Sequence, residues 1–99
     1  MSFELEKFHK AITILCGDGE KRERLIDAYL FCIIHIKEEN LPKNSQQDFK
    51  KLENDLNLVE PHEEGEGRVQ ATVNKMTAEE LDDSIMKIIN IYENLIRKE

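Results

Sequence analysis

Cysteine and histidine are the residues of this sequence best suited to hold a metal ion, but their spacing does not favour one. Cys32 and His35 lie three residues apart and can share one surface of a helix. Zinc needs four ligands, which usually come as two such pairs, and Cys16, His9 and His62 stand at no ligand-like spacing. Cys32 also falls on an apolar stripe, where a free cysteine behaves as a small hydrophobe. We therefore expect no metal centre.

Nucleophilic catalysis and phosphate binding are weakly indicated as well. Cys16 is the best candidate nucleophile because it precedes a helix N-terminus, but the spacing identifies no base, and we expect it to pack against the following helix. No serine lies in a Gly-x-Ser-x-Gly turn. Gly17-Asp18-Gly19 and Gly65-Glu66-Gly67 each place a carboxylate among the amides that an anion would need. The sequence therefore predicts no enzyme and no cofactor.

The acidic residues are concentrated in one part of the chain. The formal net charge is −7, and residues 1–52 hold equal numbers of acids and bases. Residues 53–83 hold ten acids, with only Arg68 and Lys75 as bases. Such a segment repels a phosphate backbone, so we expect no nucleic-acid partner. It suits a basic protein partner, whose approach the charge would steer; the alternative is that the acids only keep a small domain soluble.

Length and composition indicate one domain without a membrane segment. The chain has 99 residues, which is enough for a single domain, and no apolar run reaches the ~18 residues that a membrane-spanning helix needs. Residues 1–7 carry acids where an export signal has a basic start and an apolar stretch. The two cysteines are typical of reduced thiols. These features predict a cytoplasmic protein with no membrane partner.

Hydrophobic periodicity predicts an all-α fold. Leu5, Phe8 and Ile12 follow the spacing of one helical face, and Thr77 with Glu80 forms the start signal of a last helix. We predict a compact single-domain bundle, residues 1–99, of four main helices plus one short helical segment. The helices are expected at about 3–16, 20–40, 45–57, 68–75 and 78–97, with an acidic loop at 58–67.

The segment 20–40 is the most apolar and is expected to be the central helix. Its predicted core face contains Leu25, Tyr29, Cys32 and Ile36. The opposite side also holds apolar residues, namely Leu30, Phe31 and Ile34. A helix that is apolar on both sides is usually buried between others, so we expect these three to lie under the segment 69–76; left uncovered, they would form a patch of the kind that marks interfaces. The alternative, a strand at 31–36, lacks an evident partner strand.

Partner binding is the function that remains. The candidate contact residues are Phe31 and Ile34, which would form an apolar patch if left uncovered, and Glu63, Glu64, Glu66, Asp82 and Asp83, which would form one acidic face. The sequence therefore predicts a small acidic non-enzymatic protein-interaction module that regulates or inhibits a basic protein. Bacterial immunity proteins and antitoxins are examples of this class by analogy. The alternative is a structural homodimer in which Phe31 and Ile34 make a symmetric contact.

Overall fold

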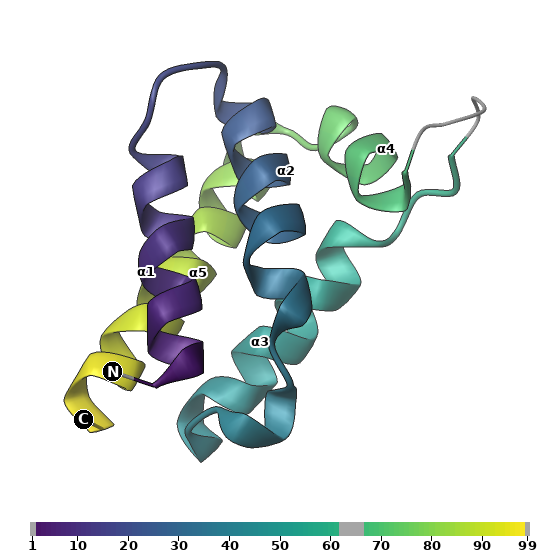
Figure 1. Cartoon of the computed structure of the whole chain (residues 1–99). Coiled ribbons are helices and arrows are strands. Elements are labelled where there is room, and N and C mark those ends of the chain that lie inside the picture. The colour runs from purple at the N-terminus through teal and green to yellow at the C-terminus, as the bar shows by residue number, and fades with distance from the viewer. Residues whose placement is uncertain (1, 62–66, 99) are drawn as a thin grey trace.

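The computed structural model describes residues 2–61 and 67–98. All regular secondary structure in these ranges is helical, so the predicted all-α bundle of four main helices and one short helix is confirmed (Figure 1). The helices are α1 (Phe3–Leu15), α2 (Lys21–Phe31), α3 (Lys43–Leu56), α4 (Arg68–Asn74) and α5 (Ala78–Lys98), with two short 3₁₀ turns, η1 (Ile33–His35) and η2 (Glu38–Asn40), between α2 and α3. None of these helices combines the length and the apolar character needed to cross a bilayer.

The helices enclose one hydrophobic core. The longest helix, α5, packs against both α1 and α3. Helix α2 also packs against α1. The short α4 closes one end of the bundle, away from the two chain termini (Figure 1). The most completely buried large side chains come from α1, α2, α3, α5 and η1: Phe8, Leu25, Ile33, Phe49, Leu52, Leu56, Ile88 and Ile91. Each main helix therefore contributes one apolar face, as the periodicity predicts.

Local signals set the ends of the first and last helices. The Ser2 hydroxyl accepts a hydrogen bond from the Leu5 amide at 3.1 Å and caps α1. Gly19 takes a φ of +107° in the turn between α1 and α2, a conformation that glycine adopts without steric cost. At α5, the Glu80 amide donates to the Thr77 hydroxyl at 3.1 Å, and the Glu80 carboxylate accepts from the Thr77 amide at 2.8 Å. The predicted capping box is confirmed.

The predicted continuous helix 20–40 is wrong, because α2 ends at Phe31 and two 3₁₀ turns follow. A helix over that whole range would be about 30 Å long, whereas the 13-residue α1 beside it spans only about 20 Å. Its last turns would extend past this neighbour. Folding back as 3₁₀ turns instead buries Ile36 and Leu41, which are 6% and 3% exposed. The branched side chains of 33, 34 and 36 also weaken a helix here. No strand forms at 31–36.

The third helix begins two residues earlier than predicted. Pro42 occupies the N-cap position, and α3 starts at Lys43 rather than at residue 45. Ser45 is fully buried, and its hydroxyl accepts a hydrogen bond from the Asn94 side chain on α5 at 2.9 Å. The Ser45 hydroxyl therefore joins α3 to α5.

The segment 68–75, whose spacing also fits a strand, is helical as predicted. Two side chains attach it to the rest of the bundle. Thr72 is buried; its hydroxyl donates to the Arg68 carbonyl at 2.8 Å and accepts from the Val59 amide at 2.9 Å. Arg22 of α2 donates to the Val73 carbonyl at 2.6 Å. These bonds fix α4 against the preceding chain and against the N-terminal end of α2.

Candidate functional site

Five exposed side chains lie along the solvent side of α2 and the turn after it. They are Glu23, Asp27, Leu30, Phe31 and Ile34, and we call this surface the outer face of α2. The spacings of three, four and seven residues among Glu23, Asp27, Leu30 and Phe31 place these four on one side of α2. Ile34 follows in η1. The opposite side of α2 is in the core through Leu25, Ile26, Ala28 and Tyr29. The surface therefore begins with two carboxylates and ends with three large apolar groups.

The apolar end of this surface is open to solvent. Phe31 is 64% exposed, Ile34 49% and Leu30 40%, so the predicted burial of these three under the segment 69–76 is wrong. The reason is the place where α4 docks: its last turn is held by Arg22, at the beginning of α2. Because α4 has only seven residues, it does not extend along α2 as far as Phe31.

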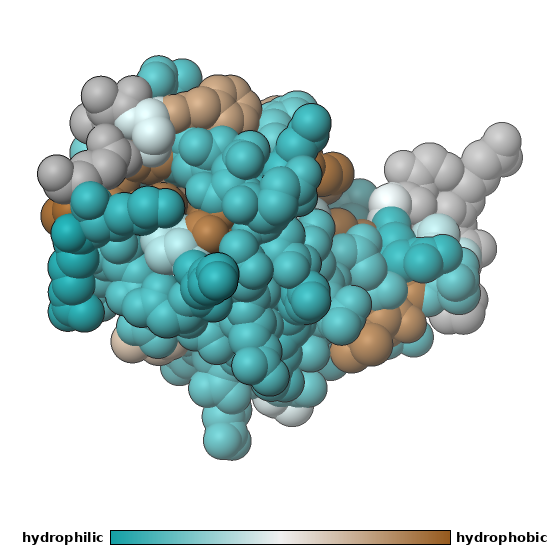
Figure 2. Space-filling view, turned by 90° about the horizontal axis from the view of Figure 1, so that it is seen from below, coloured by the Kyte–Doolittle hydropathy of each residue, from teal (hydrophilic) through white to brown (hydrophobic). Residues whose placement is uncertain are grey.

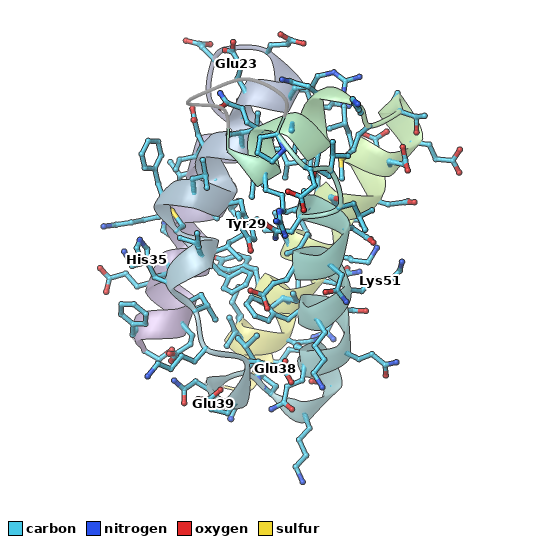
Figure 3. The ribbon with its side chains drawn as sticks, turned by 90° about the vertical axis from the view of Figure 1, so that its right-hand side faces the viewer. Glu23, Tyr29, His35, Glu38, Glu39 and Lys51 are labelled. Atoms are coloured by element: carbon cyan, nitrogen blue, oxygen red, sulfur yellow. The ribbon has the colours of Figure 1, made fainter. Side chains whose placement is uncertain are left out.

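The two carboxylates at the acidic end of the outer face form no ion pair within the described residues. Glu23 and Asp27 form no ion pair with any residue in the ranges 2–61 and 67–98. The cationic side chains of the first two turns of α2 are engaged elsewhere: Lys21 pairs with Asp82 at 2.8 Å, and the Arg24 guanidinium donates to the Leu15 and Gly19 carbonyls. The Glu23 and Asp27 carboxylates are therefore unpaired (Figure 3, Glu23), while Arg22 and Arg24 keep their positive charge because they donate to neutral carbonyls.

The apolar end has basic neighbours on α1. Lys7 and Lys10 act electrostatically on Cys32, which lies between Phe31 and Ile33 in the chain. Burial is nevertheless the larger effect and raises the pKa of the Cys32 thiol. Cys32 is 2% exposed, so its predicted place in the core is confirmed. Lys7 and Lys10 therefore act on the buried thiol beside the apolar end, and the outer face of α2 runs from carboxylates to apolar groups.

The predicted acidic face is not assembled within the described ranges. Glu63, Glu64 and Glu66 lie outside the described residues. Asp82 is engaged with Lys21, and Asp83 lines a cleft between α3 and α5. Figure 2, which views the bundle from below, shows a mostly hydrophilic surface with apolar side chains toward its margins. The negative charge near α2 comes instead from Glu23 and Asp27.

A polar cluster joins α2 to α3 inside the bundle. Tyr29 projects from α2 toward α3 (Figure 3) and is 3% exposed. Burial raises the pKa of the Tyr29 phenol, and the nearby Glu53 carboxylate raises it further, whereas a hydrogen bond with Asn57 lowers it. Burial also raises the pKa of Glu53, and the Glu38 carboxylate adds to this shift. The phenol is nearly closed to solvent, and the cluster links α2 to α3 within the bundle.

Cysteine and metal chemistry find little support in the geometry. No group of three or more His, Cys, Asp or Glu side chains that could hold a metal occurs among the described residues. Cys16 is exposed at the end of α1, so the expectation that it packs against the next helix is wrong.

Sequence reasoning identified Phe31 and Ile34 but overlooked Glu23 and Asp27. A signal was present, because Asp27 precedes Phe31 by four residues and Ile34 by seven, and Glu23 precedes Asp27 by four.

No model of a protein family matches the chain, and no curated protein or solved structure shows significant similarity to it.

Proposed function

We propose that the protein is a small non-enzymatic protein-interaction module and that the outer face of α2 is its contact surface. The observation that carries this proposal is the exposure of Leu30 and Phe31 on α2, whose other side is in the core, and of Ile34 three residues later in η1. Contiguous apolar surface is typical of protein contact sites. An exposed aromatic ring among aliphatic neighbours is the kind of group that anchors such contacts.

The partner that fits this surface is a basic protein, which the module would regulate or inhibit. The net charge of −7 attracts a basic protein at long range and orients its approach. At close range, Glu23 and Asp27 offer two unpaired carboxylates one and two helical turns before Phe31. A complementary partner therefore presents an apolar pocket for the ring and lysine or arginine side chains beside it. Both cysteines are free thiols, which suits the reducing cytoplasm as its place of action.

The contact surface is tested by one matched pair of substitutions. Ile34 and Ile96 are equally exposed, at 49% and 48%, but Ile96 lies on α5, away from the outer face of α2. Neither Ile34→Ser nor Ile96→Ser should change the free energy of unfolding by more than about 0.5 kcal/mol, since both side chains are on the surface. In affinity capture from the native host, we expect a basic protein to be retained by the wild type and by Ile96→Ser and lost with Ile34→Ser. Retention of the same proteins by both variants contradicts the proposal.

The charge of the partner is tested by a second pair. Asp27→Lys and Glu39→Lys change the net charge equally, but only Asp27 belongs to the outer face of α2, while Glu39 lies in η2. We expect Asp27→Lys to slow association with the captured protein by about tenfold, and high salt to remove most of the difference. Equal slowing by both variants would show that only total charge matters and that the carboxylates of α2 do not touch the partner.

The second candidate function is a structural homodimer built on the same apolar side chains. A two-fold axis beside Phe31 would bury Phe31 and Ile34 against their own copies, which is how isologous interfaces form. Sedimentation over a range of concentrations distinguishes the two functions. A dimer that persists in high salt and dissociates with Phe31→Ser favours the homodimer, whereas a monomer at all concentrations favours a different partner.

A further inference from the structure

A cleft of about 320 Å³ lies between α3, the chain at 58–59, the end of α4 and the first turns of α5. Its volume falls at the lower end of the range of small-molecule sites, roughly 300–1,000 Å³. Part of its wall is apolar and includes Leu58, which is 71% exposed, and Met76. None of the five residues of the outer face of α2 lines it. The cleft is therefore separate from the proposed protein contact.

The ionic groups that line this cleft are unevenly engaged. Lys51, which Figure 3 labels on the outer side of α3, pairs with Asp55 at 3.4 Å. The Glu80 carboxylate is held by the Thr77 amide. The other three charged residues of the wall are Lys75, Asp83 and Lys87, and within the described part of the chain they form no ion pair. The six charged side chains of the wall are three lysines and three acids, so their formal charges sum to zero, but the Lys75 and Lys87 ammonium groups have no carboxylate partner among the described residues.

Ser84 supplies a hydrogen-bonding group at the base of the same cleft. The residue is 2% exposed and lines the cleft, yet its hydroxyl forms no hydrogen bond with any described residue. Every side-chain oxygen or nitrogen of the described residues that is sealed from solvent has a hydrogen-bond partner. The unpaired Ser84 hydroxyl is therefore not sealed, and it opens into the cleft that Ser84 lines. A nearly buried hydroxyl without a protein partner is unusual, because such groups generally find one. It is positioned to bind a ligand atom or the water that a ligand displaces.

The geometry points to a binding site in this cleft for a small organic carboxylate with an apolar tail. The carboxylate would lie between the Lys75 and Lys87 ammonium groups and accept a hydrogen bond from the Ser84 hydroxyl. The tail would lie along Leu58 and Met76. Charge-assisted hydrogen bonds fix one end of such a molecule, and apolar contact contributes at the other. Asp55, Glu80 and Asp83 oppose a dianion more strongly than a monoanion, so a single carboxylate is the group that fits.

Titration with three probes of one shape tests the site: hexanoate, hexanol and hexylamine, each followed by proton–nitrogen correlation spectra of the whole chain. We expect hexanoate to shift the amide signals of Lys75, Ser84 and Lys87 in a saturable way. Hexanol should bind about tenfold more weakly, because it lacks the charge, and hexylamine more weakly still. Equal binding of hexanoate and hexanol would show only an apolar crevice. Shifts confined to the outer face of α2, or no saturation in the millimolar range, would overturn the proposal.

Three variants separate the named groups from a general effect of charge. Lys87→Gln should weaken hexanoate binding by about tenfold and Ser84→Ala by about threefold, values typical of a charged and a neutral hydrogen bond. Neither should alter the binding of hexanol. Lys43→Gln changes an exposed lysine at the start of α3, which does not line the cleft, and should leave hexanoate binding unchanged. If Lys43→Gln weakens hexanoate as much as Lys87→Gln does, the ligand is responding to net charge and the site is refuted.

Discussion

Thr72→Val is the substitution whose cost the structure defines most directly. The side chain keeps its shape and loses only the hydroxyl, which donates to the Arg68 carbonyl at 2.8 Å and accepts from the Val59 amide at 2.9 Å. The first bond lies within α4, and its loss costs little. The second joins α4 to the chain after α3, and its loss leaves a half-buried amide without its partner. An unsatisfied buried donor costs about 1–3 kcal/mol; because water reaches part of Val59, we expect the free energy of unfolding to fall by about 1–2 kcal/mol.

Thr13→Val is the matched control. Thr13 also donates to the carbonyl four residues earlier, that of His9 at 3.0 Å, but it is exposed and its hydroxyl accepts from no described amide. Its loss should change the free energy of unfolding by less than about 0.5 kcal/mol. Urea denaturation followed by circular dichroism gives both values. The melting temperature of Thr72→Val should fall by roughly 4–8 °C for each kcal/mol, and amide exchange at Val59 should accelerate. Equal losses in the two variants would refute the reasoning.

Three further predictions concern ionisation, thiol access and capping. The pKa of Glu53 is raised in the folded state, so the stability that this residue contributes is fully present below its ordinary value of 4.5 and is lost as the pH rises through the folded pKa. Glu53→Gln should therefore be more stable than the wild type at neutral pH and equal to it in acid, as urea midpoints at several pH values will measure. Cys16 should react with a thiol reagent in the native protein, with Cys32 slower by about a thousandfold or more because it needs unfolding; mass spectrometry of labelled peptides decides this, and fast labelling of Cys32 contradicts it. Thr77→Ala should lower the free energy of unfolding by about 1 kcal/mol and Thr77→Ser by much less, and equal thermal melts of the two would disprove the cap.

Sequence patterns predict the parts of this fold that local physics decides. α1 and α5 each present a single apolar face, and the helical period alone places both helices. The Thr77 and Glu80 pair marks the start of α5 because the two residues satisfy each other's amides. The end of α2 is different, since the apolar pattern continues through Ile36 at helical spacing. The helix stops where the chain turns and buries Ile36 and Leu41, and this tertiary packing is contained in no local pattern.

The candidate site was predictable only in part for the same reason. Phe31 and Ile34 are recognisable as a second apolar side of α2, but their exposure depends on where α4 docks. The cleft is harder to predict from the sequence than the apolar residues of α2. Its walls come from residues 51–59, 72–76 and 80–87, and only tertiary packing brings these ranges together. Ser84 shows the difficulty: on a helical wheel it is a polar residue near the core, and nothing in the sequence says which space its hydroxyl faces.

The attachment of α4 has a consequence for the order in which the protein folds. A helix of seven residues is too short to persist by itself in water, and its two side-chain anchors connect it to Val59 and to Arg22, which is 51 residues away from Val73 in the chain. The Arg22 anchor forms only once α2 has reached α4 across that separation in the chain. We therefore expect α4 to assemble after the rate-limiting step. Thr72→Val would then leave the refolding rate nearly unchanged and appear almost wholly as faster unfolding.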